Sequence, residues 1–198
     1  EGDGQVIFLS GIPGVGKSRL LHELKSQIQA EPHVLLHHQC SPYHTQSAFF
    51  PVKEQISQAA QLTGRETDAE KLAKLRAYLP PPVRGSMESV ANLLSISTED
   101  HRELSGLTPQ QIKNRTISTV VDTLMAFSVQ RPTLCIVEDA HWLDPSTLEL
   151  LQLIINRIDH ARALLIVSCR PEFRPAWITH PNTTVHSLTR LSHTEVKA

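Results

Sequence analysis

The strongest structural signal in this sequence is the segment Gly11-Ile12-Pro13-Gly14-Val15-Gly16-Lys17-Ser18. It fits the pattern G-x-x-x-x-G-K-[ST], in which backbone N–H groups and a lysine surround phosphate groups. An apolar run at residues 6–10 precedes it, and a helical pattern that we expect to cover residues 17–29 follows it. We expect this helix to bury Leu20, Leu21, Leu24 and Ile28. A strand before the loop and a helix after it are the context that this pattern requires, so the segment predicts a phosphate-binding loop (P-loop).

The residue types of this loop suit a nucleoside triphosphate. Glycine permits the tight turn and lets backbone N–H groups approach phosphate oxygens without a Cβ in the way. The helix that begins here directs its positive dipole end at the same phosphates. We expect Lys17 to reach the β- and γ-phosphates and the Ser18 hydroxyl to bind Mg²⁺. The expected nucleotide-binding set runs from Gly11 to Ser18 and includes the following residue, Arg19.

A second acidic segment completes the predicted site. Residues 133–137 form an apolar run that ends in Glu138 and Asp139. One carboxylate would hold Mg²⁺ through water while the other polarises the attacking water, so Ser18, Glu138 and Asp139 are the predicted metal-binding residues. The commonest arrangement has aspartate first and glutamate second, and here the two are reversed. The shorter aspartate at the base position affects the expected rate of hydrolysis more than nucleotide binding.

Three further polar residues follow strand-like runs. Asp144 precedes Pro145 and is placed to cap a helix, which is a sufficient structural role. His141 would either contact the γ-phosphate or hydrogen-bond the strand end. Arg170 follows the apolar run at 163–168, where it would either reach the γ-phosphate or be an ordinary surface arginine.

Strand-length apolar runs alternate with helical patterns along the whole chain. Strands are predicted at 6–10, 34–39, 133–137, 163–168 and, more weakly, 184–188. Helices are predicted at 52–62, 68–79 and 87–94, and after the caps Thr108 and Asp144. This alternation predicts an α/β fold built around a mainly parallel sheet. Together with the loop at Gly11 to Ser18, it leads us to expect a three-layer α/β/α P-loop NTPase with a mainly parallel five-stranded sheet. We expect one domain over residues 1–198, with a helical insertion at about 42–106.

Composition excludes several other classes of protein. The 198 residues are 40% hydrophobic and 20% charged, as in a globular protein. Nineteen basic and twenty acidic residues give a net charge of −1, so we expect no nucleic-acid or membrane partner. Three widely separated cysteines, Cys40, Cys135 and Cys169, predict free thiols in a cytoplasmic protein.

Together these segments resemble the P-loop signal-transduction ATPases with numerous associated domains, the STAND class. The likeness is to AAA-like modules that follow class III adenylate/guanylate cyclase domains and precede tetratricopeptide-type repeats. It is carried by five segments: 11–20 (GIPGVGKSRL), 40–52 (CSPYHTQSAFFPV), 137–151 (VEDAHWLDPSTLELL), 169–177 (CRPEFRPAW) and 188–196 (LTRLSHTEV).

The resemblance implies an Mg²⁺-dependent ATPase that acts as a switch, signalling with ATP bound and reset by slow hydrolysis to ADP or by exchange. It implies strand order 5-1-4-3-2 and a sensor role for Arg170. It also implies partner domains in the same polypeptide, which are a lid, repeats and a cyclase, and ATP-driven oligomerisation of the longer protein. Residues 188–198 resemble the start of the lid. Family members hold adenine partly with this lid and with residues ahead of Glu1, so we expect weaker binding here than in an intact protein.

Two other functions remain open from the residues alone. A P-loop kinase would pass the γ-phosphate to an acceptor, but the separate acids at 138–139 favour hydrolysis. A nucleotide-holding interaction module without significant turnover fits the reversed order of Glu138 and Asp139. A zinc site among His33, His37, His38, Cys40 and His44 is disfavoured, because neighbouring residues of a strand point to opposite faces.

Overall fold

A computed structural model describes residues 3–98 and 104–190 of the chain. Its strands are β1 (Gln5–Gly11), β2 (Val34–Gln39), β3 (Thr133–Glu138), β4 (Ala163–Cys169) and β5 (Thr183–Leu188). Its α-helices are α1 (Lys17–Gln27), α2 (Phe50–Ala59), α3 (Asp68–Tyr78), α4 (Met87–Leu93), α5 (Pro109–Gln130) and α6 (Pro145–Arg157). Short 3₁₀ turns occur at Pro42–His44, Pro81–Ser86, Ala140–Trp142, Ile158–His160 and Ala176–Thr179. Within these described ranges, no helix combines the length and the apolarity needed to cross a membrane.

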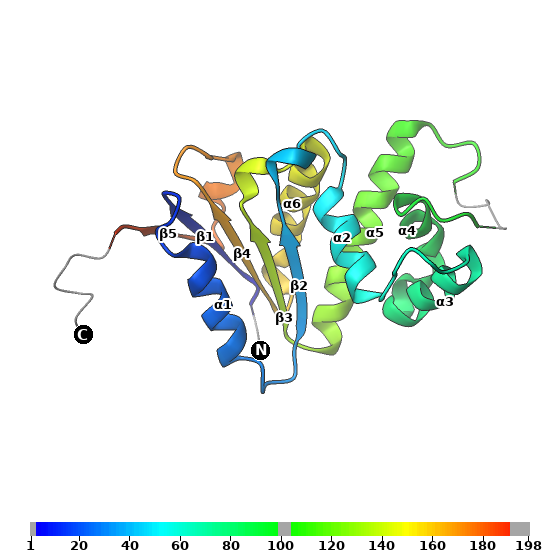
Figure 1. Cartoon of the computed structure of the whole chain (residues 1–198), viewed down its shortest axis with the longest axis horizontal. Helices are drawn as coiled ribbons and strands as arrows, with labels where there is room; N and C mark the ends of the chain where they lie inside the picture. Colours follow the sequence, from blue (N-terminus) through cyan, green and yellow to red (C-terminus); the bar gives the residue numbers. More distant parts are fainter. Residues whose placement is uncertain (1–2, 99–103, 191–198) are drawn as a thin grey trace.

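The five strands form one parallel sheet in the order β2-β3-β4-β1-β5. This confirms the predicted α/β class and the predicted order, with β4 between the two strands that precede the loop and the acidic pair. All six residues of β3 are buried, because helices cover both faces of the sheet. Figure 1 shows α1 on one face, with α5 and α6 on the other.

The two faces of the sheet are covered unequally. The face with α5 and α6 carries the larger core, which includes Leu165 and Ile155. The α1 face buries a smaller set, Leu9, Leu21, Leu134, Ile136 and Ile166. Leu21 is buried as predicted, but Leu20 is 49% exposed. The prediction for Leu20 is therefore wrong: α1 is narrow in its contact with the sheet, and Leu20 lies outside the contact.

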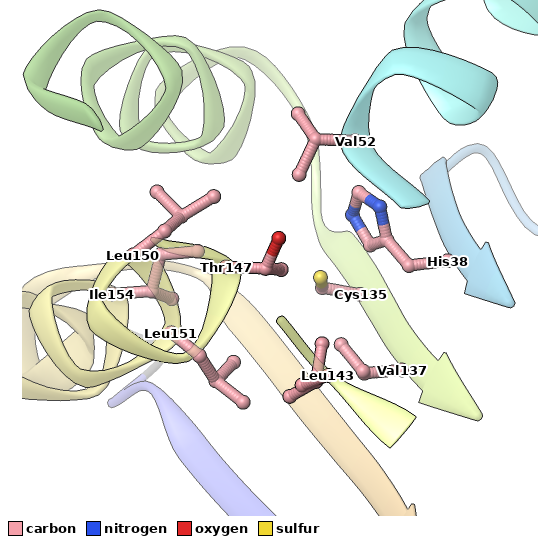
Figure 2. Close-up of a pocket in the computed structure, with 9 residues that line it drawn as sticks. All are labelled: His38, Val52, Cys135, Val137, Leu143, Thr147, Leu150, Leu151 and Ile154. Atoms are coloured by element: carbon pink, nitrogen blue, oxygen red, sulfur yellow. The ribbon is translucent and has the colours of Figure 1, made fainter. Parts of the chain in front are cut away.

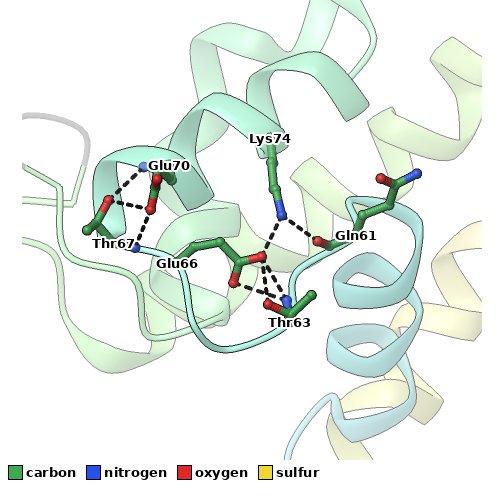
Figure 3. Close-up of polar contacts among 6 residues, drawn as sticks. All are labelled: Gln61, Thr63, Glu66, Thr67, Glu70 and Lys74. Carbon is green, nitrogen blue, oxygen red and sulfur yellow. Dashed lines mark hydrogen bonds and ion pairs between the residues drawn. The ribbon is translucent and has the colours of Figure 1, made fainter.

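Helices α2, α3 and α4 fall within residues 42–106, the range predicted for a helical insertion (Figure 1). A capping box begins α3: the Thr67 N–H donates to Glu70 Oε2 at 2.8 Å, and the Glu70 N–H donates to Thr67 Oγ1 at 3.3 Å. From the same helix, Lys74 Nζ donates to the Gln61 carbonyl at 2.7 Å and pairs with Glu66 (Figure 3). Hydrogen bonding from Lys74 holds the pKa of Glu66 well below its ordinary value. These contacts attach α3 to the end of α2.

The structure describes only part of the predicted insertion and part of the predicted lid segment. Residues 99–103 lie outside the described residues, as does the part of the predicted lid segment 188–198 that follows Arg190. Leu188, the first residue of that segment, is the last residue of β5.

Candidate functional site

The predicted site residues gather at the carboxyl edge of the sheet. Because the sheet is parallel, β1, β3 and β4 end at the same edge, the place where open α/β sheets bind ligands. A cleft of about 370 Å³ lies there. It is lined by Pro13, Gly14, Gly16, Lys17, Ser18, Arg19, Asp139, His141, Trp142 and Arg170. Of the predicted set, Gly11, Ile12, Val15 and Glu138 do not line this cleft.

The backbone of the loop requires its glycines. Gly14 has φ 76° and Gly16 has φ 107°, in the region that side-chain-bearing residues rarely adopt. At Gly11 the reason is space, since an added Cβ would lie 2.7 Å from Val15 Cγ1. The loop therefore folds tightly over the end of β1 and leaves the backbone at Gly14 and Gly16 open on its outer side.

The start of α1 offers positive charge that the first turn of the helix does not itself neutralise. Gly16 caps this helix and supplies no side-chain acceptor, and the first turn contains no acidic residue. Lys17 is buried, and its Nζ donates to the Gly11 carbonyl at 2.7 Å and to the Ile12 carbonyl at 3.2 Å. The helix N-terminus and the ammonium thus converge on one small region, which fits the phosphate groups of a nucleotide.

Glu138, at the end of β3, is held from two sides. His37 Nε2 lies 2.8 Å from Glu138 Oε1. This hydrogen bond, and after it one from the Ser18 side chain, lowers the pKa of Glu138, while burial opposes the shift. The carboxylate is therefore ionised near neutral pH and lies beside the hydroxyl predicted to bind Mg²⁺. Oxygen ligands of this kind are the ones that Mg²⁺ prefers, so the residues present fit the ion.

Asp139 has a different environment from its neighbour. Its backbone is left-handed, with φ 57° and ψ 43°, and the Ser168 hydroxyl of β4 accepts a hydrogen bond from its N–H at 3.2 Å. Gln39 Nε2 donates to Asp139 Oδ2 at 3.3 Å. The left-handed turn directs Asp139 into the cleft while Glu138 stays beneath it, so the two acids have separate positions.

Three further side chains line the cleft and come from the segments that follow β3 and β4. The guanidinium carbon of Arg170 lies 5.5 Å from the centre of the Trp142 ring, a cation–π contact that orients it. The rings of His141 and Trp142 lie 4.9 Å apart. Burial lowers the pKa of His141, and the nearby charge of Arg170 lowers it further. Among the described residues, neither ring nitrogen of His141 has a hydrogen-bond partner, so the alternative in which it bonds the strand end finds no support.

Asp144 is a helix cap. Its Oδ1 accepts hydrogen bonds from the N–H groups of Ser146 and Thr147, each at 3.0 Å. Its Oδ2 accepts one from the Thr147 hydroxyl. Asp144 does not line the cleft, and its carboxylate is occupied by the first turn of α6.

The contacts of His37, Gln39 and Ser168 could not be read from the sequence. Each joins the acidic pair to a strand that is distant along the chain, and only the register of the sheet brings them together. His37 and Gln39 lie two residues apart on one strand and therefore share a face of the sheet. This spacing is the local sequence signal that could have indicated a common environment for the two side chains.

The other hollows suit a nucleotide less well. A cavity of about 20 Å³ lies beneath α6 and has room for little more than a water molecule. Figure 2 shows the residues that line it, among them His38 and Cys135. His38 bonds the Pro51 carbonyl at 3.2 Å through Nδ1. A hollow of about 490 Å³ lies at the opposite edge of the sheet, between the end of α1 and the start of β3, but it contains no glycine-rich loop.

The three cysteines are free and buried, and burial raises their thiol pKa values to about 12 for Cys40, about 12 for Cys135 and about 11 for Cys169. They therefore remain protonated thiols at neutral pH and belong to the core rather than to the site.

Comparison with known proteins agrees with this geometry. A family profile described as the AAA ATPase domain matches residues 1–167. The chain belongs to the AAA ATPase domain family. Membership confirms the predicted AAA-like P-loop NTPase module, and it makes an ATP-binding NTPase the basic biochemical class of this domain.

Its relatives are distant. An uncharacterized protein of Rhizobium meliloti (strain 1021), R02095, is 26% identical over 198 residues, which cover 99% of this chain and 19% of that protein. The chain thus spans about a fifth of the length of this relative.

Two similar solved structures have low sequence identity. One is Caenorhabditis elegans PCH-2, with 12% identity and a TM-score of 0.37 over 94% of this chain and 36% of that one. The other is a signal-transduction ATPase with numerous domains (STAND) that has a tetratricopeptide repeat sensor, PH0952 of Pyrococcus horikoshii. It shares 15% identity, with a TM-score of 0.41 over 98% of this chain and 22% of that one.

Proposed function

We propose that this AAA ATPase domain binds Mg-ATP at residues Gly11 to Arg19 and hydrolyses it slowly, as a regulatory switch within a longer cytoplasmic signalling protein. The observation that carries the proposal is the separation of the two acids. Glu138 lies beside Ser18 beneath the loop, whereas Asp139 and Arg170 face the cleft.

Each residue has a part in the proposed reaction. Lys17 and the amides of the loop would hold the β- and γ-phosphates, and Ser18 and Glu138, with Asp139 close by, would hold Mg²⁺. The ion would neutralise the charge that develops on the phosphate oxygens. Asp139 accepts a proton from water as the water oxygen bonds to the γ-phosphorus. The bond from that phosphorus to the β–γ bridging oxygen breaks, and ADP and phosphate result.

Arg170 would contact the γ-phosphate, so its position beside Trp142 would differ between the ATP and ADP states. This is the means by which hydrolysis would reset the switch. This chain covers about a fifth of the length of its relative from Rhizobium meliloti. That coverage supports a larger protein around the domain. A lid, tetratricopeptide-type repeats, a linked cyclase and ATP-driven oligomerisation belong to the proposal by resemblance.

The test is single-turnover release of phosphate from Mg-ATP by the wild type, Asp139→Asn and Glu138→Gln. If Asp139 is the base, Asp139→Asn still binds Mg-ATP and loses turnover about 10²- to 10⁴-fold. Glu138→Gln also lowers turnover, and in addition it makes the binding of ATP less dependent on Mg²⁺. Unchanged turnover in Asp139→Asn would remove Asp139 from the mechanism.

A second function has one specific observation in its favour. The acid that faces the cleft is the shorter aspartate, and Gln39 already binds one of its oxygens. A domain that holds nucleotide as a structural switch without turnover would show tight retention of ADP and no phosphate release by the wild type. Measuring both quantities in one experiment separates the two functions.

A further inference from the structure

His37 is attached to the acidic pair across the sheet rather than along the chain. It lies on β2, where Gln39 is the residue in register with Glu138, and its ring reaches diagonally to Glu138 two positions further along β3. The distance from His37 Nε2 to Glu138 Oε1 is 2.8 Å. Its neighbour His38 points to the other face of the sheet and bonds the Pro51 carbonyl instead.

The carboxylate of Glu138 needs such a partner. Its side chain is only 7% exposed, against 33% for His37. A buried carboxylate without hydrogen bonds is costly, and its orientation would not be fixed. His37 supports it from the β2 side, and the Ser18 side chain contacts it from the α1 side. The two contacts hold the carboxylate between the sheet and the end of the P-loop.

We infer that His37 is a positioning residue for the Mg²⁺ site: its Nε2–H fixes the Glu138 carboxylate so that Glu138 and Ser18 present their oxygens to the same ion. The inference rests on the proposed function, since it assigns the metal to these two residues. Partners that orient a metal-binding side chain in other proteins change metal affinity 10- to 100-fold when removed. His37 does not line the cleft, so its effect passes through Glu138 rather than through the nucleotide.

The test measures binding rather than turnover. The affinity of the 198-residue chain for a fluorescent ATP analogue is determined in EDTA and then along a Mg²⁺ titration. His37→Phe keeps a ring of similar size without a donor, and His37→Gln restores an N–H donor. The matched control is His22→Phe, on the exposed side of α1.

The expected result separates metal binding from nucleotide binding. His37→Phe raises the Mg²⁺ concentration at half-maximal effect about 10- to 100-fold, with metal-free affinity unchanged. His37→Gln recovers most of the loss, and His22→Phe behaves as the wild type. If His37→Phe does not fold, His37→Ala provides a second variant without a donor.

Three results would overturn the inference. A wild-type Mg²⁺ dependence in the donor-free variants would show that His37 has no role in the metal site. An equal loss of metal-free and Mg²⁺-dependent affinity would show a general distortion instead. If the wild type binds no nucleotide with or without Mg²⁺, the proposed function itself fails, and this outcome is distinguished because it does not depend on His37.

Discussion

Asp144 offers a sharp test of how this fold supports its site, because the structure gives it a purely structural role. The residue is 2% exposed, and its carboxylate accepts three hydrogen bonds from the first turn of α6. That helix packs Leu150, Ile154 and Ile155 into the main core. Asp144→Ala therefore removes a helix cap and leaves the buried Thr147 hydroxyl without its acceptor.

The magnitude follows from these two losses. Removal of an N-cap costs about 0.5–2 kcal/mol, and a buried group left without its partner costs about 1–3 kcal/mol. We expect the free energy of unfolding to fall by about 2–4 kcal/mol. In a chain of this size each kcal/mol lowers Tm by about 2–4 °C, so the melting temperature falls by about 5–15 °C.

Urea denaturation at 15 °C measures the effect. Asp144→Asn keeps an oxygen that accepts the backbone hydrogen bonds, so its free energy of unfolding should fall clearly less. The control is Asp122→Ala, whose exposed ion pair with Arg157 contributes about 1 kcal/mol or less. Mg-ATP affinity, measured where each variant is folded, should be unchanged. A loss below about 0.5 kcal/mol in Asp144→Ala, or loss of ATP binding by the folded variant, would contradict a purely structural role for Asp144.

Further outcomes follow from burial and packing. Burial lowers the pKa of His38 from 6.5 to about 4, opposed by its bond to a carbonyl. The unfolded chain then binds more protons between pH 6.5 and 4, so stability falls by up to about 3 kcal/mol as pH drops through this window. In urea titrations His38→Gln should lose less stability than the wild type as pH drops through that window. The exposed control His22→Gln should match the wild type. Gly4→Ala should destabilise by about 1–3 kcal/mol, because its Cβ would lie 1.9 Å from the Ile158 carbonyl oxygen; an unchanged melting temperature would contradict this. Leu165→Ala, at a fully buried position, should cost about 2–5 kcal/mol in the same assay, and a smaller loss would mean that the core collapses around the gap.

The elements of this fold were predictable because their signals are local. The loop sequence from Gly11 to Ser18 identifies the end of one strand and the start of one helix. Thr108 and Asp144 each precede a proline at the first helical position, and both helices begin there. The strands start and end within one residue of prediction, and three of them, β1, β3 and β4, contain nearly continuous apolar runs bounded by polar residues.

Details that depend on tertiary packing were not predictable. Helical periodicity indicates an apolar stripe but not its width, and Leu20 falls outside the stripe that α1 buries. His37 and Glu138 are separated by 101 residues, and only the β2–β3 register reveals their hydrogen bond. The contact of Arg170 with Trp142 likewise joins two strand ends. The sequence therefore predicts which residues form the candidate site, whereas the structure supplies the contacts that orient them.

The proposed function depends above all on binding of Mg-nucleotide by the loop. We would measure thermal unfolding of the wild type and of Lys17→Ala with Mg-ATP, Mg-ADP and Mg-GTP. Nucleotide at 100 times its Kd stabilises the folded state by about 2.7 kcal/mol, which corresponds to about 5–11 °C for a chain of this size. We expect this shift for adenine nucleotides with the wild type and no shift with Lys17→Ala. An equal shift in both proteins, or none with any nucleotide, would contradict it.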